Sequence, residues 1–249
     1  MTNRVGFDFA GTSVLVTGGT SGIGLAVASA FAAAGAHVTV TGTRSSAADY
    51  EADLSPFAFR QLEMRDANAV DALVAGLGTL DVLVNNAGAN FPDGLDEWSP
   101  EGFSAALDLN VEGAMRLTVG AGDALAASSM AGGASVVNLV SMTAFRATNI
   151  VPGYAAAKAA LLSLTRNLAL RWAGAGIRVN AVAPGLIDTP MTAPMKDFPE
   201  MLDAEVGRAA LGRMGTPEEI AAAVLFLCCE SSAFTTGSVF AVDGGYLAL

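Results

Sequence analysis

Histidine and cysteine are scarce in this chain of 249 residues. His37 is the only histidine. It excludes a metal site built on two histidines and argues against a Ser–His–Asp triad, so we expect no metal site and a surface role for His37. The only cysteines, Cys228 and Cys229, are adjacent, and such neighbours rarely form a disulfide because its geometry would be strained. We therefore expect reduced thiols at a buried helix end in a cytoplasmic protein.

Charged residues and long apolar runs are also scarce. Charged residues make up 15% of the chain, and the formal net charge is −11. An acidic protein repels phosphate backbones and anionic lipid, so we expect no nucleic-acid partner and no membrane partner. The apolar run Ile220–Cys229 is too short to span a bilayer, and Met1–Ala10 carries Arg4 and Asp8 where a signal peptide would be apolar. Hydrophobic residues reach 52%, which is typical of a folded protein.

Short apolar runs alternate with helix-forming segments along the whole chain. The expected strands are Val14–Val16, Val38–Thr41, Phe59–Leu62, Leu80–Val84, Ala134–Val140, Arg178–Ala183 and Val239–Val242. The expected helices are Ile23–Ala34, Ala69–Gly76, Pro100–Ala127, Tyr154–Ala173 and Pro217–Cys229. This alternation predicts an α/β fold, a doubly wound parallel sheet flanked by helices. No linker or charge block interrupts it, so we expect a single domain over residues 1–249.

A glycine-rich turn, Thr17–Gly24, lies between the first expected strand and the first expected helix. Glycines allow a sharp turn and let a pyrophosphate approach the backbone, while the N–H groups and dipole of the helix bind the anion. No Gly-Lys-Ser/Thr sequence follows, which excludes a Walker-type P-loop. The turn predicts a dinucleotide site, and its candidate residues are Gly18, Thr20, Ser21, Gly22, Ile23 and Gly24.

Polar residues follow two further expected strands. Asn85–Gly88 comes after Leu80–Val84, and Ser141 follows the strand that begins at Ala134. Ligands bind beyond the carboxyl ends of the strands in an open parallel sheet, so these residues are expected beside the cofactor. Tyr154 and Lys158 are spaced i,i+4 in an expected helix and project from one face. An ammonium beside a phenol lowers the pKa of the phenol, which improves it as an acid–base catalyst at neutral pH.

Several motifs occur in one order along the chain: Thr17–Gly24, Asn85–Gly88, Asn110, Ser141, Tyr154, Lys158 and Pro184-Gly185. Together they resemble the short-chain dehydrogenase/reductase family, and the ending Asp243-Gly244-Gly245 is similar to that family's C-terminus. The resemblance covers nearly the whole chain, from about residue 10 to residue 249. It implies a Rossmann-type fold that contains its own substrate pocket, NAD(P)-dependent oxidation or reduction at CH–OH groups, and usually a homotetramer.

The resemblance also implies roles for four catalytic residues, all present here. Tyr154 would be the general acid in reduction and the general base in oxidation. Lys158 would lower the pKa of Tyr154 and bind the nicotinamide ribose. Ser141 would hold and polarise the substrate oxygen. Asn110 would place a water in a proton relay behind Lys158. A regulator without turnover would be expected to have lost one of these four, which argues against that remote alternative.

Further cofactor contacts follow from the same resemblance. Ile187 and Thr189 would meet the nicotinamide carboxamide. Glu63-Met64 stands where the family often has an Asp–Val pair against adenine, and the short span between the second and third strands predicts a reduced helix there. The full set of expected cofactor-binding residues outside the glycine-rich turn is Thr43, Arg44, Glu63, Met64, Asn86, Ala87, Gly88, Tyr154, Lys158, Pro184, Gly185, Ile187 and Thr189.

The end of the second strand bears on the choice between NAD(H) and NADP(H). It reads Thr41–Ser46 and lacks the carboxylate that would bind a ribose 2′-hydroxyl. Arg44, with its neighbouring serines, would instead hold a 2′-phosphate. Ser21 fills a position where many NADP-binding relatives carry a basic residue, which argues the other way. NADP(H) is favoured, and NAD(H) stays open.

The segment Asp188–Arg213 is irregular and rich in proline and methionine, as expected of a mobile substrate lid. Its apolar residues and others expected near it favour an apolar or aromatic ketone over a sugar: Phe91, Phe145, Ile150, Met191, Met195, Phe198 and Met201. The alternative is a 3-oxoacyl-[acyl-carrier-protein] or acyl-CoA reductase. An acidic carrier protein would need a basic docking patch, and the lid has acidic residues among its few cations, which disfavours it. The alanine-rich helices Pro100–Ala127 and Tyr154–Ala173 would pack against partner copies in a tetramer.

Overall fold

The computed structural model of the protein describes residues 5–248; residues 1–4, including Arg4, and residue 249 lie outside this range. The strands are β1 Ser13–Val16, β2 His37–Gly42, β3 Ala58–Gln61, β4 Val82–Asn85, β5 Ala134–Leu139, β6 Ile177–Pro184 and β7 Val239–Val242. They form one sheet in the order β3-β2-β1-β4-β5-β6-β7 with every pairing parallel. Each expected strand is confirmed, with its ends shifted by at most two residues.

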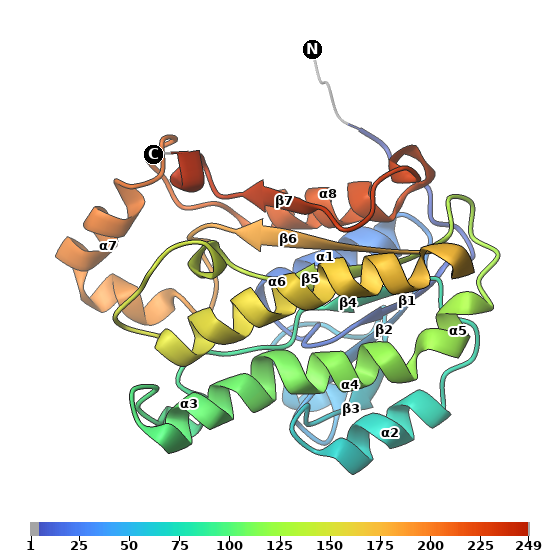
Figure 1. Cartoon of the computed structure of the whole chain (residues 1–249), viewed down its shortest axis with the longest axis horizontal. Coiled ribbons are helices and arrows are strands. Elements are labelled where there is room, and N and C mark those ends of the chain that lie inside the picture. Colours follow the sequence, from blue (N-terminus) through green and yellow to red (C-terminus); the bar gives the residue numbers. More distant parts are fainter. Residues whose placement is uncertain (1–4, 249) are drawn as a thin grey trace.

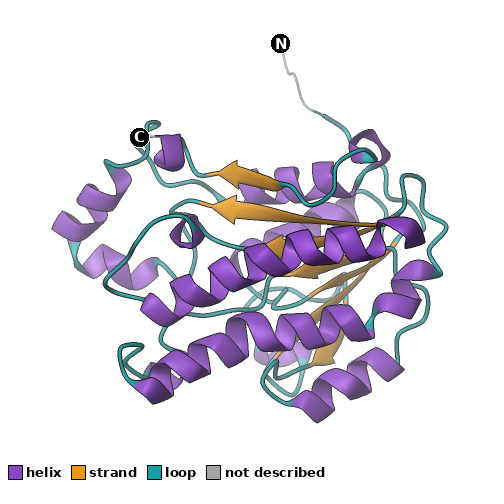
Figure 2. Cartoon of the chain, in the orientation of Figure 1, coloured by secondary structure: helices purple, strands orange, loops and turns teal. Residues whose placement is uncertain are grey.

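Helices cover both faces of this sheet (Figures 1 and 2). The helices are α1 Gly22–Ala33, α2 Ala67–Ala75, α3 Pro100–Leu107, α4 Gly113–Gly120, α5 Gly122–Ala126, α6 Pro152–Trp172, α7 Pro199–Val206 and α8 Pro217–Cys228. In Figure 1, α3, α4 and α6 lie in front of the sheet, whereas α1 and α8 lie behind it. The doubly wound fold is therefore confirmed.

Alternation along the parallel strands builds a separate core on each face. Val14 and Val16 of β1 pack into the cluster that contains α1 and α8. Leu15, between them, packs into the cluster that contains residues of α2, α4 and α6. Successive strand side chains point to opposite faces, so a strand covered on both faces must be apolar at every position. This explains the uninterrupted apolar runs in the sequence.

The expected helix Pro100–Ala127 is confirmed in its extent but is not one uninterrupted α-helix. The helix is interrupted after α3 by a π-helical turn, Asp108–Glu112, and again between α4 and α5. At the first interruption the Asn110 side chain donates to Ala106 O at 3.0 Å and so binds the backbone within its own helix. Such turns disrupt the regular i→i+4 pattern and are frequent at functional sites.

The segment Asp188–Arg213 is more ordered than expected. It contains a 3₁₀ turn, Ala193–Asp197, followed by helix α7. Beyond its ends Ile187 pairs with Gly215 in an isolated parallel bridge. The expectation of a reduced helix between β2 and β3 is confirmed, since only a 3₁₀ turn, Ala47–Asp49, lies there.

The scarce residues lie largely as expected. His37 is exposed at the start of β2. Cys228 is buried, Cys229 is partly buried, and both are free thiols. Among the described residues, no helix has the length and apolarity needed to cross a membrane.

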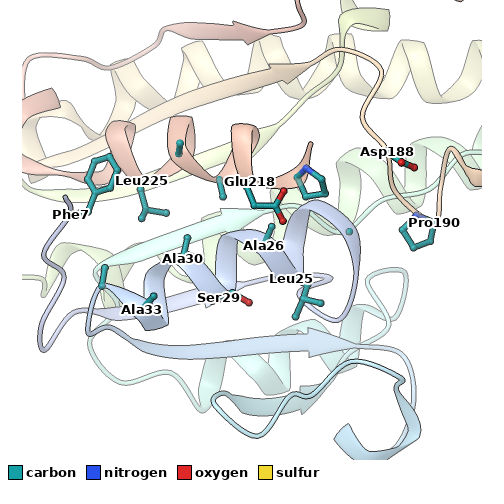
Figure 3. Close-up of a pocket in the computed structure, with 15 residues that line it drawn as sticks. Phe7, Leu25, Ala26, Ser29, Ala30, Ala33, Asp188, Pro190, Glu218 and Leu225 are labelled. Atoms are coloured by element: carbon teal, nitrogen blue, oxygen red, sulfur yellow. The ribbon is translucent and has the colours of Figure 1, made fainter. Parts of the chain in front are cut away.

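A surface hollow lies between α1 and α8 (Figure 3). Small side chains such as Ala26, Ala30 and Ala33 form its floor, with Phe7 and Leu225 at one end. Its lining contains no histidine, cysteine, lysine or arginine. The groups that carry chemistry lie elsewhere, beyond the carboxyl ends of the strands.

Candidate active site

A cavity of ≈ 1200 Å³ opens at the carboxyl end of the sheet. Strand order reverses between β1 and β4, and ligands of doubly wound sheets bind at such a switch point. Two of the expected site residues, Arg44 and Asn110, do not line the cavity. The others do: Gly18, Thr20, Ser21, Gly22, Ile23, Gly24, Thr43, Glu63, Met64, Asn86, Ala87, Gly88, Ser141, Tyr154, Lys158, Pro184, Gly185, Ile187 and Thr189.

The glycine-rich turn after β1 is fixed by Asn86 from the neighbouring strand end. The Asn86 amide donates to Thr17 O at 2.9 Å and to Gly18 O at 3.1 Å. The Thr17 hydroxyl in turn accepts from the N–H groups of Asn86 and Ala87, each at 3.0 Å. Gly24 packs so closely against Gly18 O and the Asn86 amide that a Cβ there would collide with both. Sequence motifs far apart in the chain therefore form one rigid cradle.

Helix α1 begins beside this cradle with its dipole uncompensated. Its N-cap residue Ser21 makes no side-chain cap, and the first turn contains no acidic residue. Unpaired first-turn N–H groups and the positive end of the helix dipole favour a bound anion. The donor set fits the pyrophosphate of a nicotinamide dinucleotide, which Gly18, Gly22 and Gly24 would let approach the backbone.

The other end of the cradle lies beyond β2 and β3. The Arg44 guanidinium lies over the Tyr50 ring, 5.0 Å from its centroid, and also donates to Asp49 O. The Tyr50 hydroxyl accepts from Arg44 N at 2.8 Å. Tyr50 lines the cavity and was not expected from the sequence. Arg44 is thus held at the rim of the cavity by an aromatic residue rather than lying loose in a solvated loop.

Glu63 and Met64 follow β3 and differ in burial. Met64 is buried, whereas the Glu63 carboxylate is half-exposed and accepts from Arg65 N at 3.2 Å. Both line the cavity next to Leu62. Their position is compatible with a contact to an adenine ring, with Met64 offering an apolar surface.

Ser141, Tyr154 and Lys158 meet at the centre of the cavity. Ser141 follows β5, and its hydroxyl lies close enough to the Tyr154 phenol of α6 to lower the pKa of that phenol. The Lys158 ammonium lies over the Tyr154 ring, 5.3 Å from its centroid, and donates to Leu139 O at 2.9 Å. The i,i+4 spacing on α6 and the end of β5 together place a phenol, a hydroxyl and a buried ammonium in one cluster.

The pKa of Tyr154 shifts in the direction opposite to our expectation. Burial raises the pKa of Tyr154 to about 12, the Ser141 hydrogen bond lowers it, and the Glu97 carboxylate raises it further. Burial also lowers the pKa of Lys158 to about 8. Desolvation of the charged form outweighs the attraction between phenolate and ammonium because Lys158 lies over the ring face and bonds a carbonyl.

Asn110 lies behind this cluster in the π-helical turn. Its amide donates to Ala89 O at 2.8 Å, and its Oδ1 accepts from Ala89 N at 3.2 Å. Asn110 is 1% exposed and so supports the wall of the cavity without facing it. Asn110 and Lys158 both approach Gly88, where a Cβ would contact each of them.

The opposite wall comes from the end of β6. Gly185 packs against the backbone of Asp243, where a Cβ would lie 2.7 Å from Asp243 Cα. Thr189 N donates to the Thr192 hydroxyl at 3.1 Å, which in turn donates to Ile187 O at 2.6 Å. The end of β6 therefore packs against Asp243 of the C-terminal motif, and the Thr192 hydroxyl links Ile187 to Thr189.

Several cavity residues were missed from the sequence. Tyr246, near the C-terminus, donates to the Glu205 carboxylate at 3.0 Å and accepts from Arg208 at 3.2 Å. Arg146 also lies against the Tyr246 ring, at 5.5 Å from its centroid. All four line the cavity, and no local pattern in the sequence distinguishes them from surface residues. Phe145 was expected in the lining but is exposed and lies outside it.

Comparisons with known proteins agree with the interpretation of these motifs as a dinucleotide cradle and a catalytic cluster. A family profile described as Enoyl-(Acyl carrier protein) reductase matches residues 18–247. The chain is 37% identical to a galactitol 2-dehydrogenase (L-tagatose-forming) of Cereibacter sphaeroides, covering 99% of each chain. It is 36% identical to a 3-oxoacyl-[acyl-carrier-protein] reductase of Chlamydia muridarum, covering 94% of this chain and 96% of that one.

A solved structure shows the same architecture. A putative 2-deoxy-D-gluconate 3-dehydrogenase of Agrobacterium tumefaciens, with bound NADP, superposes with a TM-score of 0.85 at 33% identity. The match covers 99% of this chain and 100% of that one. Together with the cradle and the Ser141–Tyr154–Lys158 cluster, these similarities establish that the chain belongs to the short-chain dehydrogenase/reductase family.

Proposed function

We propose that this protein interconverts a secondary alcohol and a ketone with NADP(H), Tyr154 exchanging the proton. The observation that carries the proposal is the cluster in which the Ser141 hydroxyl and the Tyr154 phenol line one cavity beside the Lys158 ammonium. Two hydroxyl donors then converge on one point of the cavity, where a carbonyl oxygen that gains negative charge is stabilised. Relatives named as galactitol and D-threitol dehydrogenases act on alcohols of this kind.

The catalytic residues have separate roles in reduction. The nicotinamide, when bound, supplies the hydride for reduction and takes it up in oxidation. Ser141 donates a hydrogen bond to the carbonyl oxygen and orients it. Tyr154 donates its proton to the same oxygen, and Lys158 stabilises the resulting phenolate through its charge. Asn110 would hold a relay water behind Lys158.

Cofactor binding would use the cradle and the rim beyond β2. Gly18–Gly24 and the start of α1 would hold the pyrophosphate, and Thr43 and Arg44 would take the 2′-phosphate of NADP(H). Arg44, stacked on Tyr50, presents several N–H donors in a fixed fork, which suits a phosphate. Two similar solved structures, both of putative sugar-acid dehydrogenases, carry bound NADP.

The substrate would be a small alcohol or ketone, covered by residues 188–213 as a lid. The alternative, a 3-oxoacyl thioester on an acidic carrier, needs unpaired cations near the entrance. The three cations of this segment are already ion-paired: Lys196 with Asp188, Arg208 with Glu205, and Arg213 with Glu219. Apolar side chains such as Phe91 and Met195 line the cavity together with Arg146 and Glu205, so the pocket is mixed rather than purely apolar.

Assembly as a cytoplasmic homotetramer would fit the surface of the helices. Met115 and Val119 on α4 are each about half-exposed, and the partly exposed Phe226 ring on α8 lies 6.3 Å from that of Phe240 on the edge strand β7. Contact between copies would cover these apolar groups. Light scattering of the purified protein measures the assembly.

Replacing Tyr154 with phenylalanine tests the proposal. The variant Tyr154→Phe lacks the proton donor, so we expect the rate of ketone reduction to fall by about a thousandfold. The assay compares NADPH with NADH on ketones and acetoacetyl thioesters, and NADP+ with NAD+ on polyols. NADPH binding to the variant serves as the control for folding. Equal rates in variant and parent would refute the role of the phenol.

A further inference from the structure

The Glu97 carboxylate is buried beside the first turn of α6. Glu97 belongs to the segment between β4 and α3 and is 0% exposed. Its Oε2 accepts from Tyr154 N at 2.7 Å, and its Oε1 accepts from Phe91 N at 2.8 Å. A buried carboxylate is costly unless it is paired or hydrogen-bonded. These two bonds compensate part of that cost, and they join the segment before α3 to two walls of the active site.

The bond to Tyr154 caps α6 from a distant part of the chain. The N-cap residue of α6, Val151, has no side-chain acceptor. Tyr154 N–H is one of the first-turn donors that have no partner within the helix. Glu97 provides the missing acceptor, and its negative charge lies at the positive end of the helix dipole. The helix that carries Tyr154 and Lys158 is therefore fixed at its start by Glu97.

The residues around Glu97 leave space for this contact and support it. A Cβ on residue 153 would lie 3.3 Å from Glu97 Oε2 and 2.8 Å from Ala106 Cβ, so Gly153 leaves the space through which the carboxylate reaches the helix. Next to it, Trp98 Nε1 donates to Asn149 O at 2.9 Å. Two neighbouring side chains thus bind the segment before α3 to the start of α6.

The second bond fixes the wall at Phe91. Phe91 lines the cavity and has a φ of 46°, a left-handed conformation that non-glycine residues rarely adopt. Such a conformation persists only when surrounding contacts hold it. The bond from Phe91 N to Glu97 is one of these contacts.

We propose that Glu97 is a positioning residue, which holds Tyr154 and the cavity wall at Phe91 in a fixed relation for proton transfer. The kinetic tests of this role rest on the proposed function. Small displacements of an acid–base group cause large losses of rate. Loss of Glu97 would therefore affect turnover without removing any group that touches the substrate.

The charge of Glu97 gives the role a distinct signature. After burial and the Ser141 hydrogen bond, the Glu97 carboxylate is the next influence on the pKa of Tyr154, and it raises that pKa. The other ionisable groups that line the cavity are Lys158 on the same helix and, from other elements, Tyr50, Glu63, Arg65, Asp93, Arg146, Glu205, Arg208 and Tyr246. Removing the Glu97 charge alone would lower the pKa of Tyr154, so phenolate would form at lower pH.

Two variants separate position from charge. Glu97→Gln removes the charge and keeps the size, so we expect kcat for alcohol oxidation to fall about tenfold and its pH profile to move down by about one unit. Glu97→Asp keeps the charge but shortens the reach, so kcat should fall while the profile stays in place. Glu101→Gln, at an exposed position in the first turn of α3, is the matched control and should behave as the parent.

Each outcome supports or refutes the positioning role of Glu97, and one of the measurements needs no enzyme activity. A folded Glu97→Gln protein with the kcat and pH profile of the parent would overturn the proposal; if that variant does not fold, an unchanged kcat in Glu97→Asp does so. If the parent itself has no activity, the proposed function fails, and NMR of isotope-labelled tyrosine decides the role of Glu97. The chain has three tyrosines, so Tyr154→Phe assigns the Tyr154 Cζ signal. That signal should move in Glu97→Gln and stay in Glu101→Gln; an unmoved signal in Glu97→Gln refutes the positioning role.

Discussion

Gly88 packs directly against the side chain of Asn110: a Cβ on residue 88 would lie 2.5 Å from Asn110 Oδ1. The same Cβ would lie 3.2 Å from Lys158 Nζ. One missing side chain therefore allows the asparagine of the π-helical turn and the lysine of α6 to approach each other. The glycine of the Asn85–Gly88 motif is required by this contact, since its φ is not in the left-handed range.

Gly88→Ala tests that contact. The new methyl group would displace Asn110 and Lys158, so we expect kcat for ketone reduction to fall by about a hundredfold. Gly78→Ala is the matched control because nothing lies within 4 Å of a Cβ there. Steady-state kinetics on both variants, with circular dichroism to check folding, make the comparison. Parent-like rates in Gly88→Ala would show that the close approach is unimportant.

The alkaline limit of reduction should report Lys158 rather than Tyr154. Burial lowers the pKa of Lys158 to about 8, so its charge is lost as the pH rises through this value. Burial raises the pKa of Tyr154 to about 12, so the phenol stays protonated over the same range. We expect kcat/KM for reduction, which reports the free enzyme, to decline above about pH 8.

Lys158→Arg provides the check, because a guanidinium stays charged at alkaline pH. The decline near pH 8 should disappear from the profile of this variant, whatever its absolute rate. A decline at the same pH in parent and variant would assign the limit to another group.

Local patterns predicted those parts of the molecule that depend on neighbours in the sequence. Apolar strands, the glycine-rich turn and the Tyr154–Lys158 spacing can each be recognised from a few neighbouring residues. The structure places the turn, Tyr154 and Lys158 in the lining of one cavity. Helix α7 could also have been predicted from a local signal, but it was missed. Pro199-Glu200 opens it, as Pro217-Glu218 opens α8, with proline in the first helical turn. The proline-rich composition of the segment obscured this signal.

Features that depend on distant contacts could not be predicted. In the sequence Glu97 resembles a surface acid in a polar loop, and one of the two bonds that compensate its burial comes from Tyr154 N, 57 residues away. In the π-helical turn the Asn110 side chain likewise binds a distant group, Ala89 O, 21 residues earlier. The predicted direction of the Tyr154 pKa shift was wrong because the i,i+4 spacing does not show how far burial removes the phenol from water.

Arg44 should determine the preference for NADP(H). Its guanidinium is held over Tyr50 at the rim of the cavity, where a 2′-phosphate would meet it. We expect Arg44→Ala to weaken NADPH binding about tenfold or more and to leave NADH binding nearly unchanged. Arg60→Ala, on the exposed edge strand β3, is the control. Fluorescence titration measures both cofactors, and equal losses for NADPH and NADH would refute the assignment.

Arg178 on β6 should be required for the stability of the fold rather than for chemistry. It is 5% exposed, and its guanidinium donates to the carbonyl groups that end α8, among them Leu227 O at 2.6 Å and Cys228 O at 3.3 Å. Arg178→Met would leave these buried acceptors without donors, at a cost of about 3 kcal/mol in the free energy of unfolding. Arg166→Met, at an exposed position on α6, should change that free energy little. Urea titration compares the two, and equal midpoints would mean that water satisfies these carbonyl groups equally well.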